Sequence, residues 1–158
     1  MPKFRGFEEV YDSCLTKGLI KDLTETNIDK IKTLLENANT NVSSANIIKK
    51  SISIKAKEWM NVYTLHYEAL RMVAEVLLRI KGVYSENHQC LFSALLAKYP
   101  ELDLDWGFFE KIRTKRHGAN YYGEMVSYED WKEIEVQATL YLSTLKKEAE
   151  NQIKPAKG

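Results

Sequence analysis

The sequence predicts an all-α protein, an up-and-down bundle of four to five main helices. Proline occurs at only three positions, so two long stretches are free of the residue that most disrupts helices. Apolar residues in those stretches recur at helical spacings, and no alternating strand pattern of useful length is present. We expect one helical domain over 1–158, with an N-terminal helical extension over 1–25 and a flexible tail over 151–158.

The first long helix is predicted to begin near residue 28. Thr26-Asn27-Ile28-Asp29 has the Thr-x-x-acid form of a helix start, and apolar residues behind it keep helical spacing as far as Ile52. The asparagine-rich cluster 37–41 is a poor helix former, so we expect it to kink or interrupt this element.

The segment 56–81 is predicted to be the central helix of the bundle. Two apolar seams lie side by side along it, so it is apolar over much of its circumference. Such a helix is about 39 Å long at 1.5 Å per residue. Gly82 follows this segment directly and is expected to form a left-handed C-terminal cap of the helix.

Three shorter or amphipathic helices are predicted to follow. Ser85 is expected to cap a helix over 88–99, and Asp105 to cap the next one, which the glycines at 118 and 123 weaken near its end. A second capping pattern, Ser127-Tyr128-Glu129-Asp130, starts the last helix.

The composition indicates a cytoplasmic globular protein without a general affinity for nucleic acid. The net charge is +1, and 28% of the residues are charged. No apolar run is long enough to span a bilayer, and the N-terminus lacks a secretory pattern. Cys14 and Cys90 have no metal-type spacing and are expected to be reduced, partly buried thiols. The histidines also lack metal-ligand spacing, so neither a metal nor a cofactor is expected.

The basic segment 111–123 is the strongest candidate for a site. It contains four cations, a histidine, an amide and two tyrosines within thirteen residues. On a continuous helix Arg113, Arg116 and Asn120 share one face, and His117 lies one turn beyond Arg113. Guanidinium groups bind phosphate through paired hydrogen bonds, and imidazoles transfer protons near neutral pH. These four side chains are therefore predicted to converge on one phosphate.

Two passages resemble the HEPN family of small helical-bundle domains. The passage 67–82, followed by 88–92, is similar to that family's long helix, in which Ala-Leu-Arg and Ala-Glu precede a Lys-Gly turn and a histidine. The basic segment is similar to the family's motif, an arginine and a later histidine with four to six residues between them. The resemblance covers roughly 28–145.

The match to the catalytic motif is partial. Arg116 matches the motif arginine, His117 matches the polar residue after it, and Tyr121 stands where the motif histidine is expected. Pairing Arg113 with His117 gives a spacing that is one residue too short. A tyrosine phenol can donate a hydrogen bond to phosphate but is a poor general base at neutral pH. Tyr121 therefore either replaces the histidine in the chemistry or marks its loss.

The resemblance implies a homodimer whose two motifs face each other across one cleft. Family members with the full motif are commonly metal-independent ribonucleases, and relatives are often paired with a nucleotidyltransferase. The favoured interpretation is an RNA- or nucleotide-binding protein of a toxin–antitoxin or defence-type system, because the displaced histidine weakens the case for catalysis. Two alternatives stay open: an active endoribonuclease that uses Arg116, His117 and Tyr121, and a structural adaptor for a nucleotidyltransferase.

Other polar residues have simpler interpretations. His66 lies within an apolar seam and is expected to be a hydrogen-bonded core histidine. His88 is expected to start a helix or to pack, although it matches the family pattern. Glu68 and Arg71, three residues apart, are expected to be a pair on the helix surface.

Overall fold

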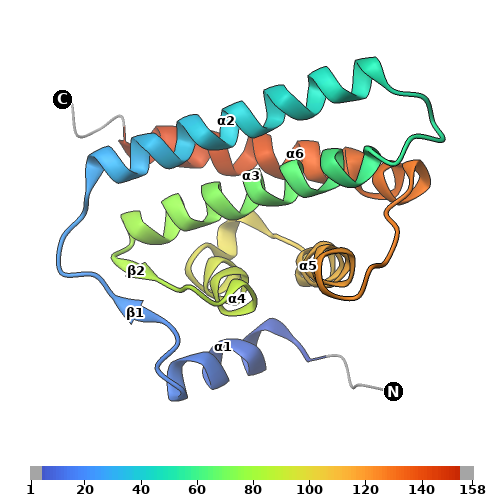
Figure 1. The fold of residues 1–158 in the computed structure, drawn as a ribbon. Coiled ribbons are helices and arrows are strands. Elements are labelled where there is room, and N and C mark those ends of the chain that lie inside the picture. The colour runs from blue at the N-terminus through green and yellow to red at the C-terminus, as the bar shows by residue number, and fades with distance from the viewer. Residues whose placement is uncertain (1–4, 154–158) are drawn as a thin grey trace.

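The computed structural model describes residues 5–153, and this part of the chain is an all-α bundle, as predicted (Figure 1). Its one sheet is a ribbon in which β1 and β2 pair antiparallel. In chain order the elements are α1 (Phe7–Thr16), β1 (Lys21–Asp22), α2 (Ile28–Ser51), α3 (Trp59–Ile80), β2 (Val83–Tyr84), α4 (His88–Lys98), the 3-10 turn η1 (Pro100–Leu102), α5 (Trp106–Tyr121) and α6 (Tyr128–Ile153).

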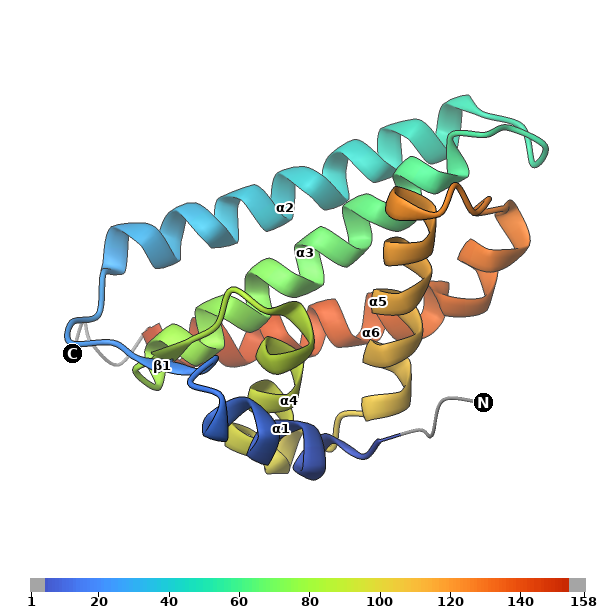
Figure 2. The ribbon, with the colours of Figure 1, turned by 60° about the horizontal axis from the view of Figure 1, so that its bottom comes forward.

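The helices form two groups that cross each other. In Figure 1 α2, α3 and α6 lie lengthwise, with α2 antiparallel to the other two, whereas α4 and α5 are seen end-on. Figure 2, in which the bottom of the first view has come forward, shows α4 and α5 side by side in front of α3 and α6, with α1 against α4. The long helices therefore form one layer, and the crossing pair α4 and α5 forms the second.

Helix α3 is the centre of the bundle, as its apolar circumference predicts. More than half of its 22 residues are buried, and it packs against α2, α4, α5 and α6. It begins at Trp59 rather than 56, because turns occupy the preceding residues. It ends beside Gly82, whose φ of +79° is the left-handed conformation predicted for the cap.

Helix α2 is continuous, so the predicted interruption at 37–41 is wrong. Tertiary contacts hold the asparagine-rich turn in helical form: Ala38 is fully buried, Asn41 donates to the sulfur of Met72, and Asn39 accepts from Lys146. Helix formation in proteins depends more on packing than on intrinsic propensity. The helix is capped by Asn27, whose side-chain oxygen accepts from the backbone N–H of Lys30, rather than by Thr26 of the predicted Thr-x-x-acid pattern.

The remaining caps follow the sequence patterns with one exception. Asp105 accepts from the N–H of Gly107, and Ser127 and Asp130 cap each other reciprocally, as predicted. Helix α4, however, is capped by Asn87. The hydroxyl of Ser85 instead donates to the backbone carbonyl of Leu19, in the segment that precedes β1. Ser85 thus stabilises the connection before the helix instead of the helix start.

The predicted termini are partly corrected. Helix α6 continues through Ile153, so 151–153 are helical instead of part of a flexible tail, and 154–158 lie outside the described residues. The N-terminal segment contains the predicted helix, α1, but also β1. Residues 1–4 lie outside the described part. Within 5–153 no helix has the length and apolar character required to cross a bilayer.

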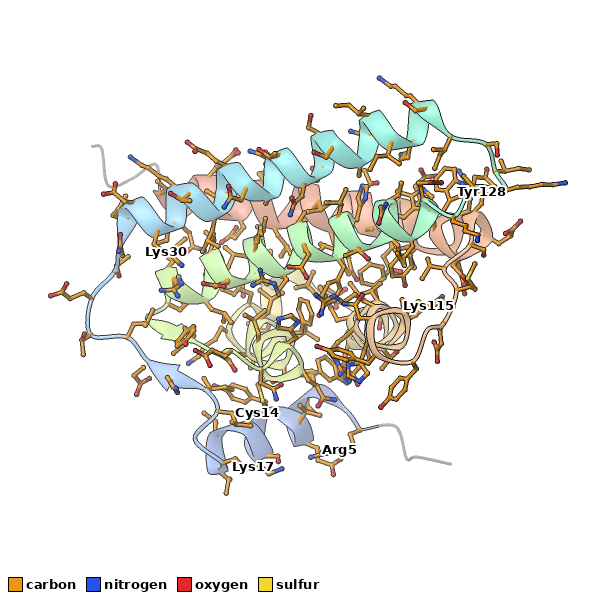
Figure 3. The ribbon with its side chains drawn as sticks, in the orientation of Figure 1. Arg5, Cys14, Lys17, Lys30, Lys115 and Tyr128 are labelled. Carbon is orange, nitrogen blue, oxygen red and sulfur yellow. A yellow bond between two sulfur atoms is a disulfide. The ribbon has the colours of Figure 1, made fainter. Side chains whose placement is uncertain are left out.

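The prediction of two reduced thiols is wrong, because Cys14 and Cys90 form a disulfide. Helix α1 packs on α4, which brings together two cysteines that are 76 residues apart in sequence (Figure 3). Both side chains are buried. Sequence spacing alone does not reveal such a pair, because disulfide formation depends on the separation of the Cα atoms in the fold.

Candidate phosphate-binding site

A pocket lies where α3, α4 and α5 meet, and we call it the α5 pocket. Its volume is about 260 Å³. It is lined by residues from α3, from the start of α4 with the loop before it, and from the second half of α5. These are Tyr67, Glu86, Asn87, His88, Gln89, Arg113, Arg116, His117 and Tyr121.

Four of the five residues predicted from the basic segment line this pocket. Arg113, Arg116, His117 and Tyr121 do so, because α5 stays helical through Tyr121 and presents them on neighbouring faces. Asn120 is exposed and is not among the lining residues. Of the four side chains predicted to converge on one phosphate, three therefore line the same pocket and Asn120 does not.

Aromatic rings surround the exposed histidine at the rim of the α5 pocket. The ring centroid of His117 lies 4.6 Å from that of Tyr121 and 5.5 Å from that of Tyr122. The two tyrosines are themselves exposed, by 69% and 73%. A nucleobase can stack on such rings, since base–aromatic stacking tolerates any base.

Arg116 is held by both a charge and a ring from α3. Its Nη2 lies 3.0 Å from Oε1 of Glu68, and its guanidinium carbon lies 5.3 Å from the ring centroid of Tyr67. The approach to Glu68 has the distance of an ion pair but lacks the direction of a hydrogen bond. Within the described residues, Glu68 Oε1 and Arg116 Nε are consequently buried without a hydrogen-bond partner.

Glu68 joins this guanidinium to a chain of ion pairs along α3. Its other oxygen accepts from Arg71 at 3.0 Å, and Arg71 also donates to Glu75 at 3.2 Å. Glu75 accepts in turn from Arg79 at 2.7 Å. The predicted surface pair of Glu68 and Arg71 is therefore present, but it also connects to the α5 pocket through Arg116.

Arg113 is oriented by a carboxylate on its own helix. Glu110 accepts two hydrogen bonds from the guanidinium of Arg113, at 2.9 and 3.1 Å. Gln89, at the start of α4, donates to the same carboxylate at 3.0 Å. Paired bonds of this kind fix the plane of a guanidinium group. Glu110 thus orients Arg113 and joins α4 to α5.

His88 lies opposite the arginines and is half-buried. Its Nδ1 is 2.8 Å from the hydroxyl of Tyr67. Burial, followed by the charge of Arg71, lowers the pKa of His88, so the ring is neutral at pH 7. Burial raises the pKa of Tyr67, which keeps its proton and is assigned as the donor to Nδ1. This tautomer leaves the Nε2–H of His88 free to donate to a ligand.

Sequence reasoning underrated the contributions from α3 and α4. His88, Tyr67 and Glu68 were not predicted as site residues, although all of them touch the α5 pocket or its arginines. The signal that favours His88 was its place in the passage that resembles the HEPN long helix. Nothing in the spacing of the sequence pairs Glu68 with Arg116, because that contact depends on how α5 crosses α3.

The charges around the α5 pocket are nearly balanced. Arg113 and Arg116 each face a carboxylate, Glu110 and Glu68, and Glu86 also lines the cavity. Within residues 5–153, no group of three or more His, Cys, Asp or Glu side chains is placed to hold a metal ion. An anion that entered the α5 pocket would compete with Glu110 and Glu68 for the two arginines.

Comparison of the chain with protein-family models, with curated proteins and with solved structures gave no match.

Proposed function

We propose that the protein binds RNA or a nucleotide by a phosphate group in the α5 pocket, as a HEPN-like component of a toxin–antitoxin or defence-type system. The observation that carries this proposal is the gathering of two guanidinium groups and two imidazoles around one cavity. Guanidinium groups match the geometry of phosphate oxygens, and neutral imidazole donates one further hydrogen bond. The exposed tyrosines at the rim supply surfaces on which a base can stack.

The existing hydrogen bonds allow a phosphate to bind the arginines without leaving Glu68 or Glu110 unpaired. When a phosphate takes Arg116, Glu68 keeps its hydrogen bond from Arg71. When a phosphate takes Arg113, Glu110 keeps its hydrogen bond from Gln89. The Nε of Arg116, which has no acceptor among the described residues, gains one if the guanidinium rotates toward the ligand. A buried charged donor without a partner is costly, so this rotation favours binding.

The test is binding of fluorescein-labelled single-stranded RNA, measured by anisotropy in the presence of a chelator. The double variant Arg113→Ala/Arg116→Ala should weaken binding by about tenfold or more, since a hydrogen bond to a charged group contributes roughly 1.5–3 kcal/mol. Lys111→Ala is the matched control, because Lys111 lies on the same helix but pairs with Glu133 outside the pocket. Equal RNA binding by the double variant and the parent contradicts the proposal, and competition by mononucleotides separates the two ligand classes.

A second candidate is a metal-independent endoribonuclease, which one observation favours: His88 and His117 line the same pocket. The imidazole of His117 can take the proton of a ribose 2′-hydroxyl, whose oxygen then attacks phosphorus. The imidazolium form of His88, which a nearby phosphate favours, can give the proton on Nε2 to the departing 5′-oxygen. The products are a 2′,3′-cyclic phosphate and a 5′-hydroxyl, and Arg116 would stabilise the charge that develops on phosphorus.

Cleavage in chelator distinguishes this candidate from simple binding. An active enzyme should lose cleavage in His88→Ala, His117→Ala and Arg116→Ala, with cyclic phosphate ends in the parent reaction. Tyr121→Phe shows whether the phenol takes part. RNA that is bound but left intact supports the binding protein, which the displaced motif histidine favours.

We also propose that the protein acts as a homodimer whose α5 pockets face each other. Apolar side chains are exposed on the segment that follows α5, where Tyr122 and Met125 are 73% and 67% exposed. The variant Tyr122→Glu/Met125→Glu should dissociate the dimer in analytical ultracentrifugation. Val136→Glu/Leu140→Glu is the matched control, because it changes exposed apolar residues on α6. A nucleotidyltransferase partner, for which the protein would serve as adaptor, is tested by co-expression with the product of the neighbouring reading frame.

A further inference from the structure

A cavity larger than the α5 pocket lies apart from it. It is a groove of about 490 Å³ between α2 and α6 with α3 beneath it, and we call it the α2–α6 groove. This volume is within the range of small-molecule sites. The groove is lined by Val42, Asn46 and Lys49 from α2, by His66 from α3, and by Thr139, Leu142, Ser143, Lys146, Lys147 and Glu150 from α6.

His66 presents one unused ring nitrogen in this groove. Its Nδ1 is 2.9 Å from the carbonyl oxygen of Val62, which can only accept, so Nδ1 carries the proton. The side chain is 3% exposed, and its ring is tilted against that of Trp131 at 4.3 Å between centroids. Nε2 makes no hydrogen bond with the described residues, yet it is not among the fully enclosed polar atoms. The neutral ring therefore offers an acceptor at the floor of the groove.

That ring stays neutral near pH 7. Burial, the largest effect, lowers the pKa of His66, and the charge of Lys49 acts in the same direction. The prediction of a hydrogen-bonded core histidine is confirmed by the contact with Val62. That contact accounts for only one of the two ring nitrogens.

The walls of the groove carry three lysines, which differ in how far acidic side chains neutralise them. Lys146 donates to the neutral amide of Asn39, and Lys49 pairs with Glu135. Lys147 is exposed, and the one lining carboxylate is Glu150. With Lys49 paired, Lys146 and Lys147 against the single lining acid Glu150 favour an anionic ligand, because neighbouring cations raise the local concentration of anions.

We propose that the α2–α6 groove binds a small polyhydroxylated anion, such as a sugar phosphate or a sugar acid. Its anionic group would lie between Lys146 and Lys147, and one of its hydroxyl groups would donate to Nε2 of His66. The carbon skeleton would rest on Val42 and Leu142, and the hydroxyl groups of Thr139 and Ser143 would supply further hydrogen bonds. This site is independent of the RNA-binding proposal for the α5 pocket.

The test is a titration of the intact protein with ribose 5-phosphate and with gluconate, followed by calorimetry and by the ¹⁵N signals of the histidine rings. The His66 Nε2 signal should shift, while that of His88 should stay in place. Ribose 5-phosphate binding alone indicates a phosphate ligand, and gluconate binding alone indicates a carboxylate ligand. Absence of a His66 shift with both probes overturns the proposal.

Variants separate a built site from general attraction to lysine. Lys146→Ala/Lys147→Ala should weaken binding about tenfold, and Lys50→Ala, an exposed lysine on α2 outside the groove, should have no effect. His66→Gln should also weaken binding, because the glutamine amide does not hold an acceptor in the position of Nε2 of His66. The melting temperature of this variant shows whether it is folded. Equal weakening in Lys50→Ala overturns the proposal.

Discussion

The α5 pocket and the α2–α6 groove both place a neutral histidine beside cations, but they hold those cations differently. In the α5 pocket two arginines are fixed by carboxylates and by neighbouring rings. In the groove the cations are lysines, and one of them, Lys146, is bonded only to a neutral amide. A fixed guanidinium group donates hydrogen bonds in set directions, but a ligand must compete with the carboxylate that already binds it. A lysine ammonium group supplies charge and imposes little direction on its hydrogen bonds. The first arrangement suits a phosphodiester held in one geometry, and the second suits a small anion.

The two regions also differ in how they are braced. Helix α1 packs against α4, and the disulfide of Cys14 and Cys90 fixes that contact. Cys90 lies two residues after His88, so the brace acts close to the α5 pocket. Neither α2 nor α6, which form the walls of the groove, is crosslinked. The covalent brace therefore supports one region and leaves the other unchanged.

The largest expected effect is loss of this brace. The variant Cys14→Ser/Cys90→Ser should lower the free energy of unfolding by about 4 kcal/mol, because the bond closes a loop of 76 residues of separation. Hydrogen exchange measured by mass spectrometry should rise in α1 and α4 more than in α2 and α6. The parent treated with a dithiol reductant should behave in the same way. Equal stability of the parent and the variant would show that the two cysteines are not bonded to each other. Reduced cysteines are the usual state in the cytoplasm, which is the location predicted from the sequence.

Most of the fold could be predicted from the sequence, since it depends on local patterns. The apolar circumference of α3, the left-handed cap at Gly82 and the reciprocal cap of Ser127 and Asp130 are all confirmed. Errors arose where a distant contact overrode the local pattern. The asparagine-rich turn of α2 stays helical because Ala38 is buried, and the cysteines pair because α1 returns to α4.

The candidate site could be predicted only as far as it lies on one helix. Arg113, Arg116 and His117 share the α5 pocket because helical spacing sets their faces. Contributions from other helices depend on how those helices cross, which periodicity does not report. Glu68 and His88 therefore entered the site only with the tertiary structure.

The second effect in size is removal of one partner of the charge network beside the α5 pocket. Arg116→Ala leaves Glu68 with Arg71 alone and should lower the free energy of unfolding by about 1–3 kcal/mol. Lys111→Ala removes an ion pair whose side chains are 46% and 60% exposed, so it should change stability by no more than about 0.5 kcal/mol. Urea unfolding of both variants measures the difference. Equal losses would mean that the pocket network is no more stabilising than a surface pair.

The pH dependence of stability should distinguish the two histidines. Burial lowers the pKa of both His66 and His88, so the unfolded chain takes up protons that the folded chain does not. Stability should therefore fall as pH falls below about 6.5, the ordinary pKa of histidine, until the lowered pKa of each folded ring is reached.

Two variants and one ligand sharpen this test. His66→Gln and His88→Gln should each reduce the slope of unfolding free energy between pH 7.5 and 5.5. Bound RNA should reduce the slope due to His88, because a nearby phosphate favours its protonated form, and should leave the slope due to His66 unchanged. An RNA effect on both rings would indicate that the ligand reaches the groove as well.

The smallest expected effect is a change in the salt dependence of RNA binding. Each phosphate contact that an arginine makes with a single strand releases counterions and contributes about 0.7 to the slope of log K against log salt concentration. Arg116→Ala should therefore reduce that slope by about 0.7. Lys146→Ala/Lys147→Ala should leave it unchanged, because both lysines line the α2–α6 groove and not the α5 pocket. Anisotropy titrations at several salt concentrations give both slopes. If the lysine variant lowers the slope as much as the arginine variant does, one nucleic-acid strand contacts both regions. The assignment of RNA to the α5 pocket and of a separate small anion to the α2–α6 groove is then wrong.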